Sequence, residues 1–321
     1  MDVGDPLFRT EFAVDVVDLF LAILTAPLLS GWIGTCRAVL SNRTPAGVFQ
    51  PFWDLLRLFG KEVILPEHTS FLFRAVPFGV FGILSVSALF IPLLNIRPLL
   101  GPVADVVVLI GLFSLVRMLM AFGAMDAGTP FGDLGARREM MVGFLAEPAT
   151  LMILFTVSLW SGSTSLSRII QSLLSSSDPV HPSLMFALMA YILVFLAENG
   201  RLPIDNPATH LELTMIHEAM ILEYSGPLLG MMEWSAHLKL FLYLLIGIDF
   251  FFPAGLPAEL SPPAVILGIF LLIGKLMAAG TALAIVEILF AKLRIFRVPE
   301  FTALAYLLAS IGFLIHFVLE V

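Results

Sequence analysis

The chain has 321 residues, of which 59% are hydrophobic and 13% charged, and its formal net charge is −8. An average soluble domain has about 25% charged residues, and a soluble protein of this length could not cover its surface with so few polar groups. No basic stripe is present to meet phosphates, which excludes a nucleic-acid-binding protein. The composition therefore predicts an integral membrane protein.

A single cysteine, Cys36, limits the redox chemistry of the chain. It excludes a disulfide framework, a zinc site built from several thiolates and a complete ligand set for an iron–sulfur cluster. We therefore expect no metal or cofactor to be bound by this chain, so any electrons must be carried by another polypeptide. The first ten residues contain Asp2 and Asp5 and no basic region, unlike a cleaved signal peptide.

Apolar segments long enough to cross a membrane follow one another along the whole chain. A hydrocarbon core of about 30 Å requires about 20 apolar residues in a helix. The hydrophilic loops between the segments are too short to fold alone, and we find no internal repeat or second domain. We expect one all-α membrane domain over residues 1–321, a polytopic bundle of about eight transmembrane helices. The predicted spans are roughly 12–36, 71–94, 103–125, 139–161, 183–198, 236–253, 263–290 and 299–319.

Two stretches between the spans are predicted to be helical without crossing. From Gln50 to Lys61, apolar residues fall on one face and charged residues on another, which is typical of a helix in the membrane interface. The stretch from Asp205 to Ser225 is too polar to span. Asp205 or Asn206 can cap a helix there, and Gly226-Pro227 can stop it. We expect this acidic loop, between the fifth and sixth spans, to lie on or dip into the cytoplasmic face.

The basic residues of the short loops predict the orientation. Eight crossings divide the loops into two alternating sets, and the cytoplasmic set of a membrane protein carries an excess of Lys and Arg. Both termini belong to the poorer set, so we expect them outside. The richer set holds Arg37, Arg43, Arg57, Lys61, Arg74, Arg137, Arg138, Arg201, Lys292, Arg294 and Arg297, and the poorer set holds Arg9, Arg97 and Arg168.

Several charged residues fall inside apolar segments, where an ionised side chain costs at least ~2.5–3.5 kcal/mol and therefore calls for a partner or a role. Asp15, Asp18 and Asp249 lie near span ends and are expected to reach the interface. Arg117 is expected to neutralise a carboxylate. For Lys275 a proton relay and a static ion pair remain open, but Glu287 lies on the opposite flank of the same helix and is not its expected partner. The other candidates are Glu139, Glu147 and Glu198.

The acidic loop continues this series. Glu212 and Glu223 are eleven residues apart, about three helical turns, so on one helix both would project from the same face as an inward-facing row. For Glu218 and Glu233 a solvated face is an equal alternative. His210 and His217 invite a metal or haem hypothesis. The span interiors offer only His316 as a further histidine, so we do not favour that hypothesis.

Three motifs in one order resemble the membrane "heel" subunit of respiratory complex I and its relatives. The first runs from Glu198 to Asp205 and on to Glu212-Leu213 and Glu223-Tyr224. The second consists of Gly135-Ala136, Arg138 and Glu147. The third is RTPAGVFQPFWDLLRLFGKEVILP from Arg43, similar to the interfacial helix of that family. Together they cover most of the chain and match the same eight-helix plan.

The departures from complex I point to one branch of this family. Three extra residues lie between Glu212 and Glu223, Ile204 replaces a Phe, and an aromatic-Glu pair has become Ala146-Glu147. The form HEAMILEYSG from His217 is similar to the membrane-bound [NiFe] hydrogenases of the formate hydrogenlyase and hydrogenase-4 type. The changed loop is the one that shapes the quinone chamber in complex I, so quinone binding is not a firm expectation.

The resemblance implies roles for individual residues. Glu139, Glu147, Glu198, Asp205, Glu212 and Glu223 would form a proton path, and Arg138, Arg201, Glu218 and Tyr224 would shape the loop and its interface, with Arg201 and Asp205 as an ion pair. The chain would have no redox centre of its own and would dock hydrogenase large and small subunits, an iron–sulfur subunit and antiporter-like membrane subunits in a prokaryotic cell membrane. The nickel–iron centre and the iron–sulfur clusters would belong to those partners.

Other functions remain open. The first alternative is the quinone-binding membrane subunit of an NADH:quinone oxidoreductase. A free-standing secondary transporter would usually show an internal repeat, which we do not find. A purely structural membrane anchor is the third.

Overall fold

The computed structural model describes residues 6–94, 101, 104–175, 181–205, 215–253, 255, 262–290, 293 and 297–320. Within these ranges every named element is a helix, and the expected polytopic all-α bundle is confirmed. Seven helices are long and apolar enough to cross a membrane. They are α1 (Pro6–Leu40), α3 (Phe71–Phe90), α4 (Val106–Asp126), α5 (Pro130–Ser161), α10 (Gly226–Phe251), α11 (Pro262–Leu289) and α12 (Val298–Ile315), which continues as η2 (His316–Glu320).

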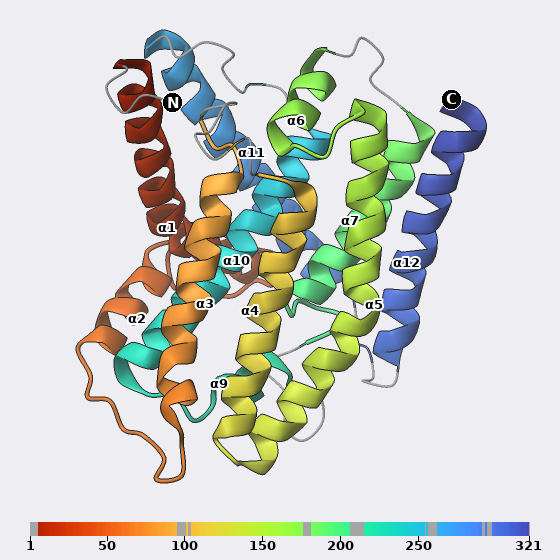
Figure 1. The fold of residues 1–321 in the computed structure, drawn as a ribbon. Helices are drawn as coiled ribbons and strands as arrows, with labels where there is room; N and C mark the ends of the chain where they lie inside the picture. Colours follow the sequence, from red (N-terminus) through yellow and green to blue (C-terminus); the bar gives the residue numbers. More distant parts are fainter. Residues whose placement is uncertain are drawn as a thin grey trace.

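The predicted fifth span is α7 (Pro182–Glu198), an apolar helix of 17 residues. At ~1.5 Å per residue it is about 25 Å long, shorter than the other spans. The start of α1 and the end of α12 lie at the same end of the bundle, as an even number of crossings requires (Figure 1). The short helices α2 (Gln50–Phe59) and α9 (His217–Ile221) lie at the other end, together with the turn between α4 and α5. We call this end of the bundle the α9 end. A further short helix is α6 (Leu166–Ser175).

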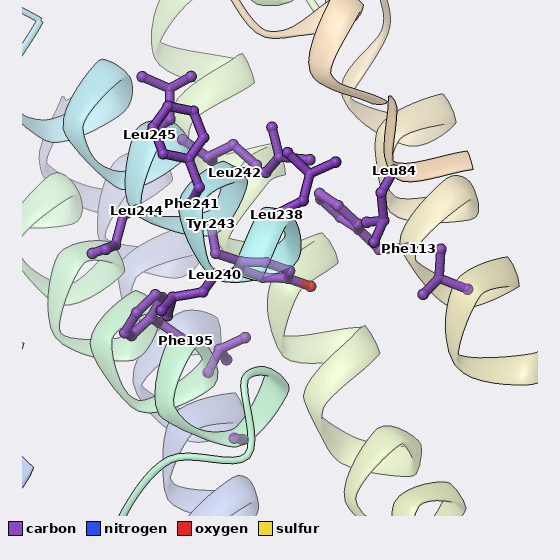
Figure 2. Close-up of a cluster of buried hydrophobic side chains, with 14 of the residues drawn as sticks. Leu84, Phe113, Phe195, Leu238, Leu240, Phe241, Leu242, Tyr243, Leu244 and Leu245 are labelled. Atoms are coloured by element: carbon purple, nitrogen blue, oxygen red, sulfur yellow. The ribbon is translucent and has the colours of Figure 1, made fainter. Parts of the chain in front are cut away.

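Helix α10 forms the centre of the bundle. It contacts α1, α2, α3, α6, α7 and α11, and it is the most deeply buried of the seven long helices. Figure 2 shows its aromatic and leucine side chains from Leu238 to Leu245 packed with Phe113 of α4 and Phe195 of α7. In contrast, α11 packs mainly on α1 and exposes most of its surface.

Two spans begin about nine or ten residues earlier than expected. Helix α5 starts at Pro130, where Thr129 accepts a hydrogen bond from the Gly132 amide at 3.3 Å, so Glu139 lies well inside the helix. Helix α10 starts at Gly226. Our expectation that Gly226-Pro227 stops a helix was wrong, because the fixed φ of proline also suits the first turn of a new helix. Glu233, His237 and Lys239 therefore belong to α10.

The prediction of a single helix over the acidic loop is also wrong. Met215 and Ile216 are not helical, and α9 contains only His217–Ile221. The Asp205 carboxylate accepts hydrogen bonds from the amides of Ile216 at 3.2 Å and His217 at 3.0 Å, which starts a new helix at that point. Glu223 lies after the end of α9, so it does not share a helical face with Glu212 as expected. Glu212 and His210 lie outside the described residues.

The predicted amphipathic helix is confirmed as α2. Leu55 is buried against the bundle, which α2 contacts through α1 and α10. Trp53 and Leu56 are exposed on the opposite flank. A helix with a bound apolar side and exposed aromatic residues fits the membrane interface; its position relative to the bilayer stays a prediction.

Candidate functional site

Arg117 gathers three carboxylates inside the bundle. Its side chain lies on α4 and is only 4% exposed. Nε lies 3.2 Å from Oε1 of Glu139, Nη1 lies 2.7 Å from Oε1 of Glu147, and Nη2 donates to Oε1 of Glu198. The planar guanidinium has five N–H donors, so it can bind several carboxylates at once. Three helices, α4, α5 and α7, thereby meet at one ionic cluster.

Lys239 of α10 completes this cluster. Its Nζ lies 3.4 Å from Oε2 of Glu198, so the most buried carboxylate is held between two cations. With Arg117 and Lys239 against Glu139, Glu147 and Glu198, the five ionised groups would carry one net negative charge. We did not single out Lys239 from the sequence, although a lysine inside an apolar span was a sufficient signal. We call these five residues the Arg117 cluster.

The local sequence of α5 explains how the cluster fits. Glu139, Gly143 and Glu147 are spaced four residues apart and therefore lie along one helical face. A Cβ atom at Gly143 would lie 2.2 Å from Nη1 of Arg117. The guanidinium thus occupies the space that a side chain at position 143 would fill. The two glutamates bind it from one turn before and one turn after Gly143.

A small cavity, lined by both apolar and charged side chains, lies between the cluster and the loop that follows α7. Its volume is about 60 Å³, which is room for a few water molecules. Glu139, Glu198 and Lys239 of the cluster are among its lining residues, and so are Asp205 and His217. The cavity can therefore hold a hydrogen-bonded chain of water between the α9 end and the Arg117 cluster.

The loop itself is fixed by contacts different from those expected. We expected Arg201 to pair with Asp205, but the ion pair of Arg201 is with Glu287 of α11, at 3.3 Å between Nη1 and Oε1. Glu287 also pairs with Arg37 of α1 at 3.5 Å. Arg138 donates to the Met215 carbonyl at 3.0 Å, next to the residues that Asp205 caps. These bonds tie the loop to α1, α5 and α11.

Burial shifts the acid–base behaviour of α9, which lies outside the membrane-spanning segments. Desolvation, helped by the positive charges of Lys239 and Arg201, lowers the pKa of His217 from 6.5 to about 4, so this imidazole is neutral at neutral pH. Desolvation, with the nearby charge of Asp205, raises the pKa of Glu218 above its ordinary value. Desolvation and Asp126 likewise raise the pKa of Tyr224, whose ring stacks on Phe73 with centroids 4.0 Å apart.

The remaining sequence candidates separate into two groups. Glu223 follows α9, is partly exposed and does not line the cavity. Asp15, Asp18 and Asp249 were expected to reach the interface; all three side chains are buried in the bundle, and their depth in the membrane stays a prediction. Oδ2 of Asp18, for example, accepts a hydrogen bond from the Leu94 amide at 3.2 Å. The expectation that Lys275 is not the partner of Glu287 agrees with the two arginine pairs.

Among the described residues, no group of three or more His, Cys, Asp and Glu side chains is arranged to hold a metal ion. The cluster and the cavity bring together groups whose chemistry allows them to bind and release protons: three carboxylates, a capping aspartate and a neutral histidine. Buried carboxylates with partners of opposite charge are typical of proton pathways in membrane proteins.

Known proteins are similar to this chain over most of its length. A family model described as NADH dehydrogenase matches residues 16–318. Formate hydrogenlyase subunit 4 of Escherichia coli (strain K12) is 31% identical over 302 residues, covering 93% of this chain and 96% of the relative. Hydrogenase-4 component C of the same organism is 28% identical and covers 91% of each chain. A subunit of the NADH-quinone oxidoreductase of Pelagibacter ubique (strain HTCC1062) is 27% identical, covering 78% of this chain and 74% of its own.

A solved structure shares the fold. A chain of the membrane-bound sulfane sulfur reductase, an archaeal respiratory membrane complex, matches 95% of this chain with 99% of its own length, at a TM-score of 0.81 and 21% identity. The two chains therefore share the arrangement of their helices.

Proposed function

Because the chain belongs to the NADH dehydrogenase family of membrane proteins, we propose that it is the membrane anchor subunit of a multisubunit [NiFe] hydrogenase complex. In this complex it docks the hydrogenase module and couples electron transfer in partner subunits to proton movement through its own carboxylates. The single observation that carries the coupling role is the Arg117 cluster, in which Glu198 is held between Arg117 and Lys239 at the end of a cavity large enough for water.

The relatives support the hydrogenase branch over complex I. Formate hydrogenlyase subunit 4 and hydrogenase-4 component C match this chain over nearly their whole lengths, whereas the NADH-quinone oxidoreductase relative matches over a smaller share. The sequence of the acidic loop favours the same branch. The partners are then hydrogenase large and small subunits, an iron–sulfur subunit and antiporter-like membrane subunits, and the redox cofactors belong to them.

Two surfaces near the Arg117 cluster would each face a neighbouring subunit in such a complex. The α9 end carries the loop and the cavity, so it is the end on which a hydrogenase module would dock, on the cytoplasmic side by the excess of basic residues. At the other side of the cluster the Glu147 side chain is 36% exposed on the flank of the bundle. An ionised carboxylate facing lipid would cost at least ~2.5–3.5 kcal/mol, so we place a membrane subunit against this flank.

The coupling follows from charge. A redox step in the docked module changes the charge next to the loop, and the loop reaches the cluster through Asp205 and the cavity. A shift in the local potential changes the proton affinity of the nearest carboxylates. A proton then enters through the cavity to Glu198 and leaves through a further group. This chain supplies positions for the proton and holds no electron carrier of its own.

Purification of the tagged chain in mild detergent tests the assignment. We expect nickel–iron subunits to co-purify, with nickel in stoichiometric amount and hydrogen-evolving activity. A complex that contains no nickel and reduces a quinone would replace this proposal by the quinone-binding role. Transport activity of the chain alone in vesicles would replace it by a transporter.

A further inference from the structure

We propose that Glu287 of α11 is a positioning residue for proton transfer to Glu198, because it holds, through Arg201, the loop whose residues line the cavity beside Glu198. The inference rests on the proposed function, since the position of the loop matters to coupling only if Glu198 exchanges protons. It gives a role in coupling to α11, a helix whose described residues neither belong to the Arg117 cluster nor line that cavity.

The carboxylate of Glu287 is buried and shared between two arginines. The residue lies two positions before the end of α11, and its side chain is 1% exposed. Oε1 lies 3.3 Å from Nη1 of Arg201 in the loop after α7, and Oε2 lies 3.5 Å from Nη1 of Arg37 near the end of α1. A buried carboxylate is costly unless cations or hydrogen-bond donors pair with it. Glu287 therefore joins the end of α11 both to the loop and to α1.

A backbone hydrogen bond holds the loop at a second point. The Leu293 amide, four residues beyond the end of α11, donates to the Pro203 carbonyl at 3.0 Å. Pro203 follows Arg201 by two residues, so the two contacts hold the same short piece of the loop. Helix α11 itself packs mainly on α1. The loop is thus fixed against a pair of helices that lies outside the Arg117 cluster.

The loop passes the position of Arg201 on to Asp205 through hydrogen bonds. The Arg201 carbonyl accepts hydrogen bonds from the amides of Ile204 at 2.9 Å and of Asp205 at 3.4 Å, which closes a tight turn. The Asp205 carboxylate in turn accepts the amides of Ile216 at 3.2 Å and of His217 at 3.0 Å at the start of α9. A displacement of Arg201 therefore displaces Asp205 and the start of α9 with it.

The residues held in this way line the cavity beside Glu198. Ile204, Asp205 and His217 are among its lining residues, and its volume of about 60 Å³ is room for a few water molecules. A proton passes between two groups only when they lie within hydrogen-bond reach, directly or through one water. In a cavity of this size, a small shift of the loop changes which waters fit. The contacts of Glu287 thereby set whether a proton can reach Glu198.

The two arginines separate the positioning of the loop from the stabilisation of α11. Both pair with the same carboxylate and both are partly exposed, with 51% of the Arg37 side chain and 25% of the Arg201 side chain accessible. Removal of either one takes away one ion pair of Glu287, so similar decreases in melting temperature are expected. Arg201 belongs to the loop and Arg37 to α1, so the loop is released by the loss of Arg201 and stays in place after the loss of Arg37.

Three glutamine variants test the positioning role. We would reconstitute the assembled complex in vesicles and measure the number of protons translocated per hydrogen evolved, together with the melting temperature. Arg201→Gln and Glu287→Gln are each expected to lower the ratio at least twofold. Arg37→Gln is the matched control and should keep the wild-type ratio. A purely structural role of the two ion pairs would lower the melting temperature and leave the ratio unchanged in all three variants.

Hydrogen–deuterium exchange of the same complexes tests the link to α9. The amides of Ile216 and His217 are protected by the Asp205 carboxylate, so they should exchange faster in Arg201→Gln than in Arg37→Gln. Equal exchange in these two variants would show that Arg201 does not position Asp205, which overturns the inference.

Glu198→Gln in the proton assay separates this inference from the proposed function. If Glu198→Gln lowers the ratio while Arg201→Gln equals the wild type, or if Arg37→Gln lowers the ratio as much as Arg201→Gln, the positioning role is wrong and the proposed function stands. If Glu198→Gln keeps the full ratio, the proposed function itself fails. Should Glu287→Gln not assemble, the comparison of Arg201→Gln with Arg37→Gln decides alone.

Discussion

Replacing Arg117 with methionine removes the centre of the ionic cluster and keeps most of the side-chain volume. Glu198 is 3% exposed and would keep Lys239 as its one cationic partner among the described residues. Breaking a buried ion pair by removing one partner costs ~3–5 kcal/mol, and we take ~3 kcal/mol because the second cation remains. The pair with Glu147, which is 36% exposed, adds no more than ~1 kcal/mol. We therefore expect a loss of ~3–4 kcal/mol in the free energy of unfolding.

At about 2 °C per kcal/mol for a chain of this size, the melting temperature should fall by about 6–8 °C. Tryptophan fluorescence of the purified complex on heating measures it. Arg57→Met is the matched control, because Arg57 and its partner Asp54 are 70% and 53% exposed and such pairs contribute ~0–1 kcal/mol.

A double variant tests the cause of the loss. Arg117→Met combined with Glu198→Gln removes the buried charge that lacks its main partner, so it should be more stable than Arg117→Met alone. The reasoning is refuted if Arg117→Met melts at the same temperature as Arg57→Met, or if the second change adds a further loss.

Two further predictions concern the surroundings of the cluster. Gly143→Ala should destabilise by ~1–3 kcal/mol by displacing the Arg117 guanidinium, whereas Gly82→Ala, with open space around its Cβ, should not; equal melting temperatures for the two would contradict the close contact. Burial lowers the pKa of His217 to about 4 in the folded chain, whereas its ordinary value is 6.5. Between these two pH values the unfolded chain binds a proton at His217 and the folded chain does not. The free energy of unfolding should therefore decrease as the pH falls from 6.5 toward 4. His217→Gln should lose this part of the pH dependence of the melting temperature, while His68→Gln, in an exposed loop, keeps it.

The sequence predicted the parts that depend on the cost of charge in an apolar environment. Hydropathy located the spans, and the three glutamates of the cluster were singled out because an ionised carboxylate in a span needs a partner. Arg117 was expected to neutralise one carboxylate. That it binds three depends on the packing of α4, α5 and α7, and on a glycine at position 143, which no local pattern indicates.

The predictions that failed rest on local sequence features that are compatible with more than one structure. Pro227 was interpreted as the end of one helix and is at the start of the next. Asp205 or Asn206 was expected to cap a helix over the acidic loop, whereas the Asp205 carboxylate binds the amides of Ile216 and His217 at the start of α9. Arg201 was paired with a near neighbour in sequence, whereas its partner Glu287 is 86 residues away. Contacts between residues so far apart in sequence are set by tertiary packing, so the spacing of residues along the chain does not predict them.

The measurement that tests the central claim most directly is the number of protons translocated per hydrogen evolved by the reconstituted complex carrying Glu198→Gln. Glu300→Gln, an exposed residue in the first turn of α12, serves as the control. The account predicts that Glu198→Gln loses most of the proton translocation while the control keeps it. A complex that assembles with Glu198→Gln and translocates as many protons as the wild type would contradict the account.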